Sequence, residues 1–188
     1  LLRPGVNILN KFNGLHRYMN WDKPILTDSG GYQIMSLSKL NKIDKKIGAV
    51  FQSHLDGTKI VLSPEKSIQV QKIINSDILM VLDECPKLTR EKKILSKSIE
   101  ISTSWAKRCK IEFGNSNTKA LFGIAQGGLD KDLRAESIQK LIDIGFDGYA
   151  MGGLAVGESQ EDMFKILNET TDYLPKNQPR YLMGVGTP

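Results

Sequence analysis

Five short apolar runs along the chain each end in a polar side chain or a glycine. They lie directly before Thr27-Asp28, Asp83, Gln126, Gly152 and Gly184. Buried parallel strands have this continuous apolar character, and they deliver the groups that follow them to one edge of a sheet. In α/β barrels that edge, at the C-terminal ends of the strands, carries the chemistry. The pattern therefore predicts a parallel sheet with a site built from two carboxylates, one carboxamide and glycine-flanked backbone amides.

Helical patterns separate most of these runs. The predicted strands span 25–28, 77–83, 120–126, 147–151 and 180–185. The predicted helices span 63–74, 89–113, 130–144 and 159–174, three of them opened by a Ser or Asp that can cap the first turn. From residue 77 onward the order is β-α-β-α-β-α-β, which favours right-handed crossovers. On the apolar stripe of helix 89–113, Trp105 and Cys109 are expected to be core residues.

Two further segments are predicted outside this alternation. Residues 1–20 are expected to form a loop or a helical lead-in. Residues 47–62 are expected to form an inserted hairpin whose turn is His54–Gly57, since Asp-Gly is a strong turn signal. With 188 residues, the chain is short for an eight-fold barrel, which needs about 250. The expected fold is thus one incomplete α/β domain over 1–188, a partial (β/α)8 barrel.

Composition narrows the possible functions only slightly. The net charge of +5 fits a polyanionic partner without demanding one, because much of the lysine lies on predicted helix surfaces. Two Cys and two His without C-x-x-C or H-x-x-x-H spacing give no recognisable metal site and no disulfide framework, so a cytoplasmic setting is the default. No apolar run reaches the length of a membrane span.

Asp83 and Gln126 are the most informative candidates. Asp83 ends a continuous apolar strand, so its carboxylate is partly desolvated and needs donors. A helix N-terminus or a lysine could supply them, and so could a base with two adjacent N–H groups, such as guanine. The Gln126 amide can donate to a carbonyl such as guanine O6, and the glycines at 152 and 153 let backbone amides approach the same oxygen.

Asp28, Ser29 and Tyr32 supply a second carboxylate and an aromatic ring. Two acids in different environments can divide the roles of acid and base. Tyr32 could stack on a flat ring, at roughly 1–3 kcal/mol. Helix capping by Asp28 and Ser29 explains those two residues equally well. A nucleophilic Ser29 is unsupported, because neither histidine is placed to act as its base.

The same residues identify a known family. The chain resembles the bacterial-type tRNA-guanine transglycosylases, the queuine tRNA-ribosyltransferase family, over essentially all 188 positions. The segments that carry the resemblance are 25–33, 82–86, 123–128, 148–158 and 181–186. At Cys85 and Val156 the sequence resembles the bacterial members of the family. These generally use 7-aminomethyl-7-deazaguanine.

The resemblance implies a (β/α)8 barrel enzyme of queuosine biosynthesis. Such an enzyme exchanges guanine at the wobble position of a tRNA anticodon for a 7-deazaguanine, through a covalent enzyme–tRNA intermediate. The implied partners are the tRNA anticodon loop, guanine and the incoming base, with a homodimer for the full-length protein and no membrane. By motif, Asp28 would be the general acid/base, Ser29 would support the site, and Tyr32 and Met183 would sandwich the ring.

The remaining implied roles concern the edge of the base. Asp83 and Gln126 would read that edge, and the Gly153 amide would donate to the base carbonyl. The Leu154 carbonyl and Glu158 would serve the aminomethyl substituent of the incoming base.

The resemblance also implies parts outside this stretch. The family's nucleophilic aspartate, its structural zinc with three cysteines and one histidine, and its tRNA-gripping surface would lie beyond Pro188, and the first barrel strands before Leu1. No cofactor is expected within 1–188. Two alternatives are a non-catalytic partner subunit that binds base or tRNA, and an archaeal-type enzyme that modifies another tRNA position. The intact set of Asp28, Asp83 and Gln126 disfavours the first, and the 154–158 string disfavours the second.

We expect the isolated 188-residue chain not to complete the exchange, because the expected nucleophile lies outside it. The measurement is incorporation of labelled guanine into tRNA, with a full-length relative as the positive control. Incorporation by the chain alone would contradict this expectation.

Overall fold

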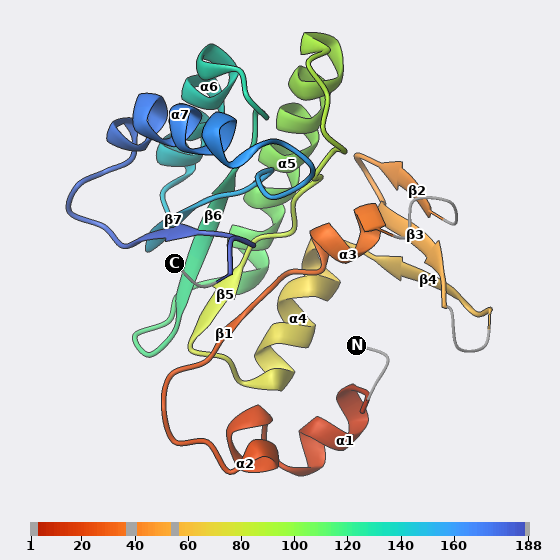
Figure 1. The fold of residues 1–188 in the computed structure, drawn as a ribbon. Helices are drawn as coiled ribbons and strands as arrows, with labels where there is room; N and C mark the ends of the chain where they lie inside the picture. The colour runs from red at the N-terminus through yellow and green to blue at the C-terminus, as the bar shows by residue number, and fades with distance from the viewer. Residues whose placement is uncertain (1–3, 37–40, 54–56, 187–188) are drawn as a thin grey trace.

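The fold is known from a computed structural model, which describes residues 4–36, 41–53 and 57–186 (Figure 1). Residues 54–56, and with them most of the expected turn His54–Gly57, lie outside the described residues.

A curled five-stranded parallel sheet forms the centre of the molecule. Its strand order is β1-β5-β6-β7-β8, and every neighbouring pair is parallel. The strands are β1 (Leu26–Thr27), β5 (Ile78–Met80), β6 (Ala120–Ala125), β7 (Gly148–Met151) and β8 (Arg180–Leu182). All five predicted strands are present; β7 ends at Met151 as predicted, and the other four end earlier than the apolar pattern suggested. The predicted partial (β/α)8 barrel is confirmed as a half-barrel.

Helices follow the strands as the sequence predicted. They are α4 (Pro64–Ile74), α5 (Lys92–Phe113), α6 (Lys131–Ile144) and α7 (Gln160–Thr170), the last continued by a 3-10 turn at Thr171–Tyr173. Ser63, Asp130 and Ser159 cap α4, α6 and α7 through their side-chain oxygens. Helix α5 begins at Lys92 rather than Thr89, because the Thr89 hydroxyl accepts the Glu91 N–H in a local turn.

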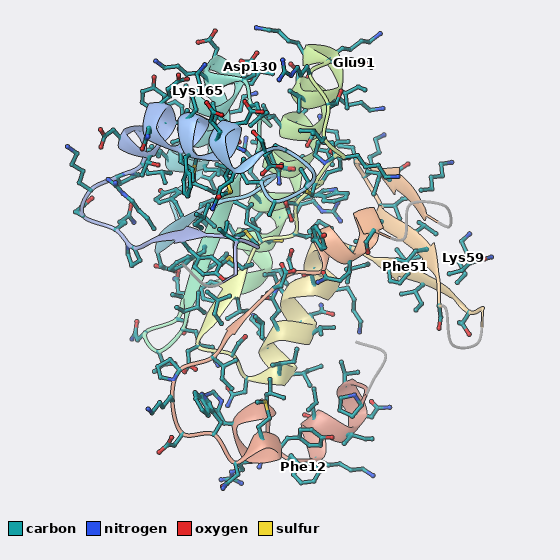
Figure 2. The ribbon with its side chains drawn as sticks, viewed as in Figure 1. Phe12, Phe51, Lys59, Glu91, Asp130 and Lys165 are labelled. Atoms are coloured by element: carbon teal, nitrogen blue, oxygen red, sulfur yellow. The ribbon has the colours of Figure 1, made fainter. Side chains whose placement is uncertain are left out.

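Three short helices complete the N-terminal part. The lead-in is helical, with α1 (Val6–Lys11) and α2 (Leu15–Met19) below the sheet in Figure 1. Figure 2 shows Phe12, which follows α1, at that end of the molecule. Helix α3 (Gly31–Ser36) follows β1 and was not predicted from the sequence. It brings its residues over the ends of the central strands.

The predicted insertion is a three-stranded antiparallel sheet rather than a hairpin. Strands β3 (Gly48–Gln52) and β4 (Lys59–Leu62) form the expected pair, and β2 (Asn41–Asp44) is an unpredicted third strand on β3. The sheet lies beside α3 in Figure 1. Its β2–β3 turn is held by α5, since Trp105 Nε1 donates to Lys45 O at 3.0 Å and Arg108 donates to Lys46 O at 2.7 Å. Arg108 also forms a two-bond ion pair with Glu65 on α4.

The core lies between the sheet and helices α4, α5 and α6. Trp105 and Cys109 are fully buried there, as predicted from the stripe on α5. Among the described residues, no helix combines the length and the apolar character needed to cross a membrane.

Gln71 on α4 extends the short edge strand β1. Its Nε2 donates to Met80 O and its Oε1 accepts from Met80 N, both at 2.9 Å, so the side-chain amide pairs with β5 beyond the point where β1 ends. The Thr27 hydroxyl donates to the same Oε1 at 2.9 Å. This fully buried amide therefore fixes the end of β5, three residues before Asp83.

Replacing Gln71 by leucine should lower the free energy of unfolding by about 2–4 kcal/mol, because two buried backbone groups lose their partner and the Thr27 hydroxyl keeps only Ser76 Oγ. The matched control is Gln69→Leu on the exposed face of α4, where only a surface bond to Glu112 is lost. Urea denaturation of the two variants measures the difference. Equal destabilisation would contradict the assigned role of Gln71.

Candidate functional site

A cavity of about 300 Å³ opens at the C-terminal ends of the central strands. This volume is at the small end of the range for small-molecule pockets, ~300–1,000 Å³, and suits a single flat ring system. Its walls come from the segments that follow β1, β5, β7 and β8 and from α3. Six of the residues predicted from the sequence line it, namely Asp28, Tyr32, Asp83, Gly153, Leu154 and Met183.

Asp83 lies at the back of this cavity. It is 6% exposed, and its Oδ2 accepts a hydrogen bond of 2.6 Å from Gln126 Nε2. Burial raises the pKa of Asp83 to about 7, and the negative charge of Asp28 adds to the rise, while the Gln126 hydrogen bond opposes it. The carboxyl group therefore changes its charge near neutral pH. Among the described residues, no lysine pairs with this carboxylate, and its side-chain hydrogen-bond partner is Gln126.

Gln126 stands behind the cavity wall rather than in it. It is fully buried at the end of β6, and its backbone N–H donates to Ser137 Oγ at 3.0 Å. The sequence suggested that its NH₂ group donates to a base carbonyl, whereas here that group donates to Asp83. Within the described part of the chain, Gln126 Oε1 is buried without a hydrogen-bond partner. The pair thus retains unused hydrogen-bonding capacity next to the cavity.

Two glycines let backbone approach these polar side chains. A Cβ on Gly31, the first residue of α3, would overlap Asp83 Oδ1. A Cβ on Gly153 would overlap Gln126 Oε1, and Gly153 also has a φ of +62°, which favours glycine. The glycines therefore bring α3 and the loop after β7 directly against the Asp83–Gln126 pair.

Asp28 and Ser29 satisfy backbone groups at the entry to α3. Asp28 Oδ1 accepts from Ser29 N at 2.7 Å, and Ser29 Oγ accepts weakly from Gly31 N at 3.4 Å. Ser29 is buried and does not line the cavity, whereas Asp28 is exposed and does. Ser29 thus acts as a weak cap on the first residue of α3, whereas the Asp28 bond lies before the helix and Asp28 presents its carboxylate to the cavity.

The loop after β7 is held by Glu158. The Glu158 carboxylate accepts from the N–H groups of Ala155 and Val156, the second at 3.0 Å. Because a trans peptide directs its N–H and C=O to opposite sides, the Leu154 carbonyl points away from Glu158. It lies near Gly184, which lines the cavity. Glu158 does not line the cavity, and its role is to hold the loop through these hydrogen bonds. Within the loop, Ala155 has a φ of +57°.

The sequence missed several contributors to the site. Gln33 and Ala155 line the cavity, and α3 was needed to place Gln33. Arg134 is fully buried beneath the loops after β6 and β7. The sequence contained a sign of this burial, because positions 134, 138 and 141 fall on one stripe of the predicted helix and only Arg134 is charged.

A second cavity, of about 350 Å³, lies at the starts of α5 and α6 and along α7. Figure 2 labels Asp130 and Lys165, which line it, at the end of the molecule opposite Phe12. Asp130 already caps α6 and pairs with Lys92 at 2.9 Å, so its charge is satisfied by the protein. Within the described residues, no group of three or more His, Cys, Asp or Glu side chains could hold a metal ion. The first cavity is therefore the candidate site.

Comparison with known proteins shows to which family this chain belongs. A family model described as queuine tRNA-ribosyltransferase matches residues 1–188. The chain belongs to this family. Curated proteins named queuine tRNA-ribosyltransferase are 55% identical in Jannaschia sp. (strain CCS1) and 52% identical in Ruegeria pomeroyi, each over 188 residues that cover all of this chain and 50% of the relative. A third, from Acinetobacter baylyi, is 51% identical over 189 residues and 49% of its length.

The chain thus spans about half the length of the curated relatives it matches. The family resemblance stated from the sequence is confirmed.

Replacing Asp83 by asparagine should stabilise this member of the queuine tRNA-ribosyltransferase family, more at pH 8 than at pH 5. The pKa of Asp83 is raised from 3.8 to about 7, so the native state binds the proton more tightly than the unfolded state. The native protein consequently loses stability as the pH rises between these two values, and the variant avoids that loss. The gain should grow by about 1 kcal/mol or more from pH 5 to pH 8 in urea denaturation.

The control is Asp143→Asn, an exposed carboxylate on α6. It should change the free energy of unfolding little at either pH. An equal gain for Asp83→Asn at both pH values would contradict a desolvated Asp83.

Proposed function

We propose that this chain supplies the base-binding part of a tRNA-guanine transglycosylase, which exchanges guanine at the anticodon wobble position of tRNA for 7-aminomethyl-7-deazaguanine. The observation that carries the proposal is the convergence of Asp28, Asp83, Tyr32, Met183 and the Gly153 backbone on one cavity sized for a single base. Membership of the queuine tRNA-ribosyltransferase family supports it.

The Asp83 carboxylate recognises the base through two adjacent donors. When ionised it accepts from guanine N1–H and from the exocyclic amine, which is a charge-assisted pair of hydrogen bonds in a dry site. Burial has already desolvated this carboxylate, so little water has to be removed when the base binds. Adenine lacks the N1–H and the amine at this edge, and Asp83 therefore rejects it.

The opposite groups of the cavity complete the recognition. The Gly153 N–H and the Gln126 amide donate to the base carbonyl, with Gln126 leaving Asp83 as the base takes its place. Tyr32, which is 48% exposed in this structure, and Met183 cover the two ring faces. The Leu154 carbonyl, directed away from Glu158, accepts from the aminomethyl group of the incoming base.

Asp28 provides the proton transfers of the exchange. The bond from ribose C1′ to the base nitrogen breaks and its electron pair leaves with the base. An oxygen of the family's nucleophilic aspartate, a residue distinct from Asp28 and Asp83, forms the new bond to C1′. Asp28 lines the same cavity and gives a proton to the departing base. It recovers a proton from the incoming base, which then attacks C1′ and releases the carboxylate, so the proton balance closes over one exchange.

Guanine affinity of the 188-residue chain should fall about tenfold per pH unit below pH 7, because protonation of Asp83 competes with the base for the carboxylate. Isothermal titration calorimetry from pH 5.5 to pH 8 measures this dependence. Asp83→Asn should bind guanine at least about tenfold more weakly at pH 8 and lose the pH dependence.

The matched control is Glu84→Gln, which removes the neighbouring carboxylate outside the cavity lining. It should keep the affinity within about threefold at pH 8, because burial and, to a smaller extent, the Glu84 charge raise the pKa of Asp83, but Asp83 is already mostly ionised at that pH. Guanine binding that is independent of both pH and Asp83 would refute the proposed recognition.

A further inference from the structure

Arg134 on α6 is a buried charge that the proposed recognition of the base does not use. Its side chain is fully buried, and no carboxylate forms an ion pair with it among the described residues. Burial lowers the pKa of its guanidinium to about 10, with the charge of Glu158 opposing the shift, so it is still a cation at neutral pH. Burying an unpaired charge is unfavourable unless hydrogen bonds offset the loss of water.

The guanidinium donates its hydrogen bonds to backbone carbonyls of two loops. Nε donates to Gly128 O at 2.6 Å, and Nη2 donates to Gly152 O at 3.0 Å and more weakly to Gly153 O at 3.5 Å. Gly127 permits this approach, because a Cβ there would overlap the Arg134 backbone and side chain. One cation therefore ties the loop after β6 to the loop after β7.

This contact fixes the direction of a peptide that faces the cavity. The Gly152 carbonyl points to Arg134, so the N–H of Gly153 in the same trans peptide points to the other side. On that side the Gly153 N–H interacts with the Cys85 thiol, where it opposes the rise in the pKa of that group. Cys85, Gly152 and Gly153 all line the cavity. A cation on the carbonyl side also polarises the peptide and strengthens its N–H as a donor.

We propose that Arg134 is a positioning residue, which orients and polarises the Gly152–Gly153 peptide so that the Gly153 N–H binds the carbonyl oxygen of the base. The inference rests on the proposed function, since it takes guanine as the occupant of the cavity. Arg134 does not touch the base. It prepares a donor for the negative charge that develops on the base when the bond to ribose breaks.

The test compares two ligands, of which only guanine carries the base carbonyl. The fluorescent base 2-aminopurine keeps the exocyclic amine but lacks both the carbonyl and N1–H, so it binds the parent chain more weakly than guanine and serves to compare the variants with the parent. Arg134→Met should weaken guanine binding about tenfold, the loss of one charge-assisted hydrogen bond, and leave 2-aminopurine binding within about twofold. Calorimetry measures the first affinity and fluorescence titration the second, both on the 188-residue chain at pH 8.

Two further variants keep the result decisive. Arg134→Lys retains the charge without the planar fork, and it should show the same selectivity with a loss of about threefold, which carries the comparison if Arg134→Met does not fold. Lys140→Met removes a cation from the exposed face of the same helix, where it pairs with Glu136, and should change neither affinity.

The outcomes separate this inference from the proposed function. Failure of the parent chain to bind guanine would overturn both. Guanine binding that Arg134→Met and Arg134→Lys leave unchanged would overturn the role of Arg134 alone. A parallel loss of guanine and 2-aminopurine would also overturn it, because it would show that Arg134 only packs the loops.

Discussion

The hydrogen bond between Gln126 Nε2 and Asp83 Oδ2 joins two buried polar groups at the ends of neighbouring strands. One bond of 2.6 Å does not replace the water that a carboxylate loses on burial, and the pKa of Asp83 rises to about 7 as a result. Gln126 Oε1 is likewise buried without a partner among the described residues. The fold therefore holds a polar pair in a state that a ligand with matching donors would improve.

The rest of the structure keeps that pair in place and keeps backbone close to it. Gln71 fixes the end of β5 by pairing with Met80 where β1 has ended. Gly31 and Gly153 allow α3 and the loop after β7 to press against the two side chains. These supports come from three separate segments of the sequence, and together they close a cavity that no single motif defines.

The strands, the longer helices and most of the cavity lining could be predicted from the sequence. The end of each apolar run marks where a parallel strand reaches the edge of its sheet, and this located the lining. Asp28, Asp83 and Gly153 were located in this way. Helix α3 and strand β2 could not be predicted, because their few residues have weak local preferences and are held by contacts with distant segments. The Gln126–Asp83 bond was also missed, since pattern does not show which partner a buried amide chooses. Arg134 was visible as the single charge on a buried stripe, but its carbonyl partners belong to loops.

The central claim is that Asp83 pairs with Gln126 in the free protein and that a bound base replaces Gln126 on Asp83. A crystal structure of the chain with guanine tests it most directly. We expect the base between Tyr32 and Met183, its N1–H and exocyclic amine on the Asp83 carboxylate, and Gln126 Nε2 turned from Asp83 to the base carbonyl. Guanine bound elsewhere, or bound here with the Gln126–Asp83 hydrogen bond intact and no contact between the base and Asp83, would contradict the claim.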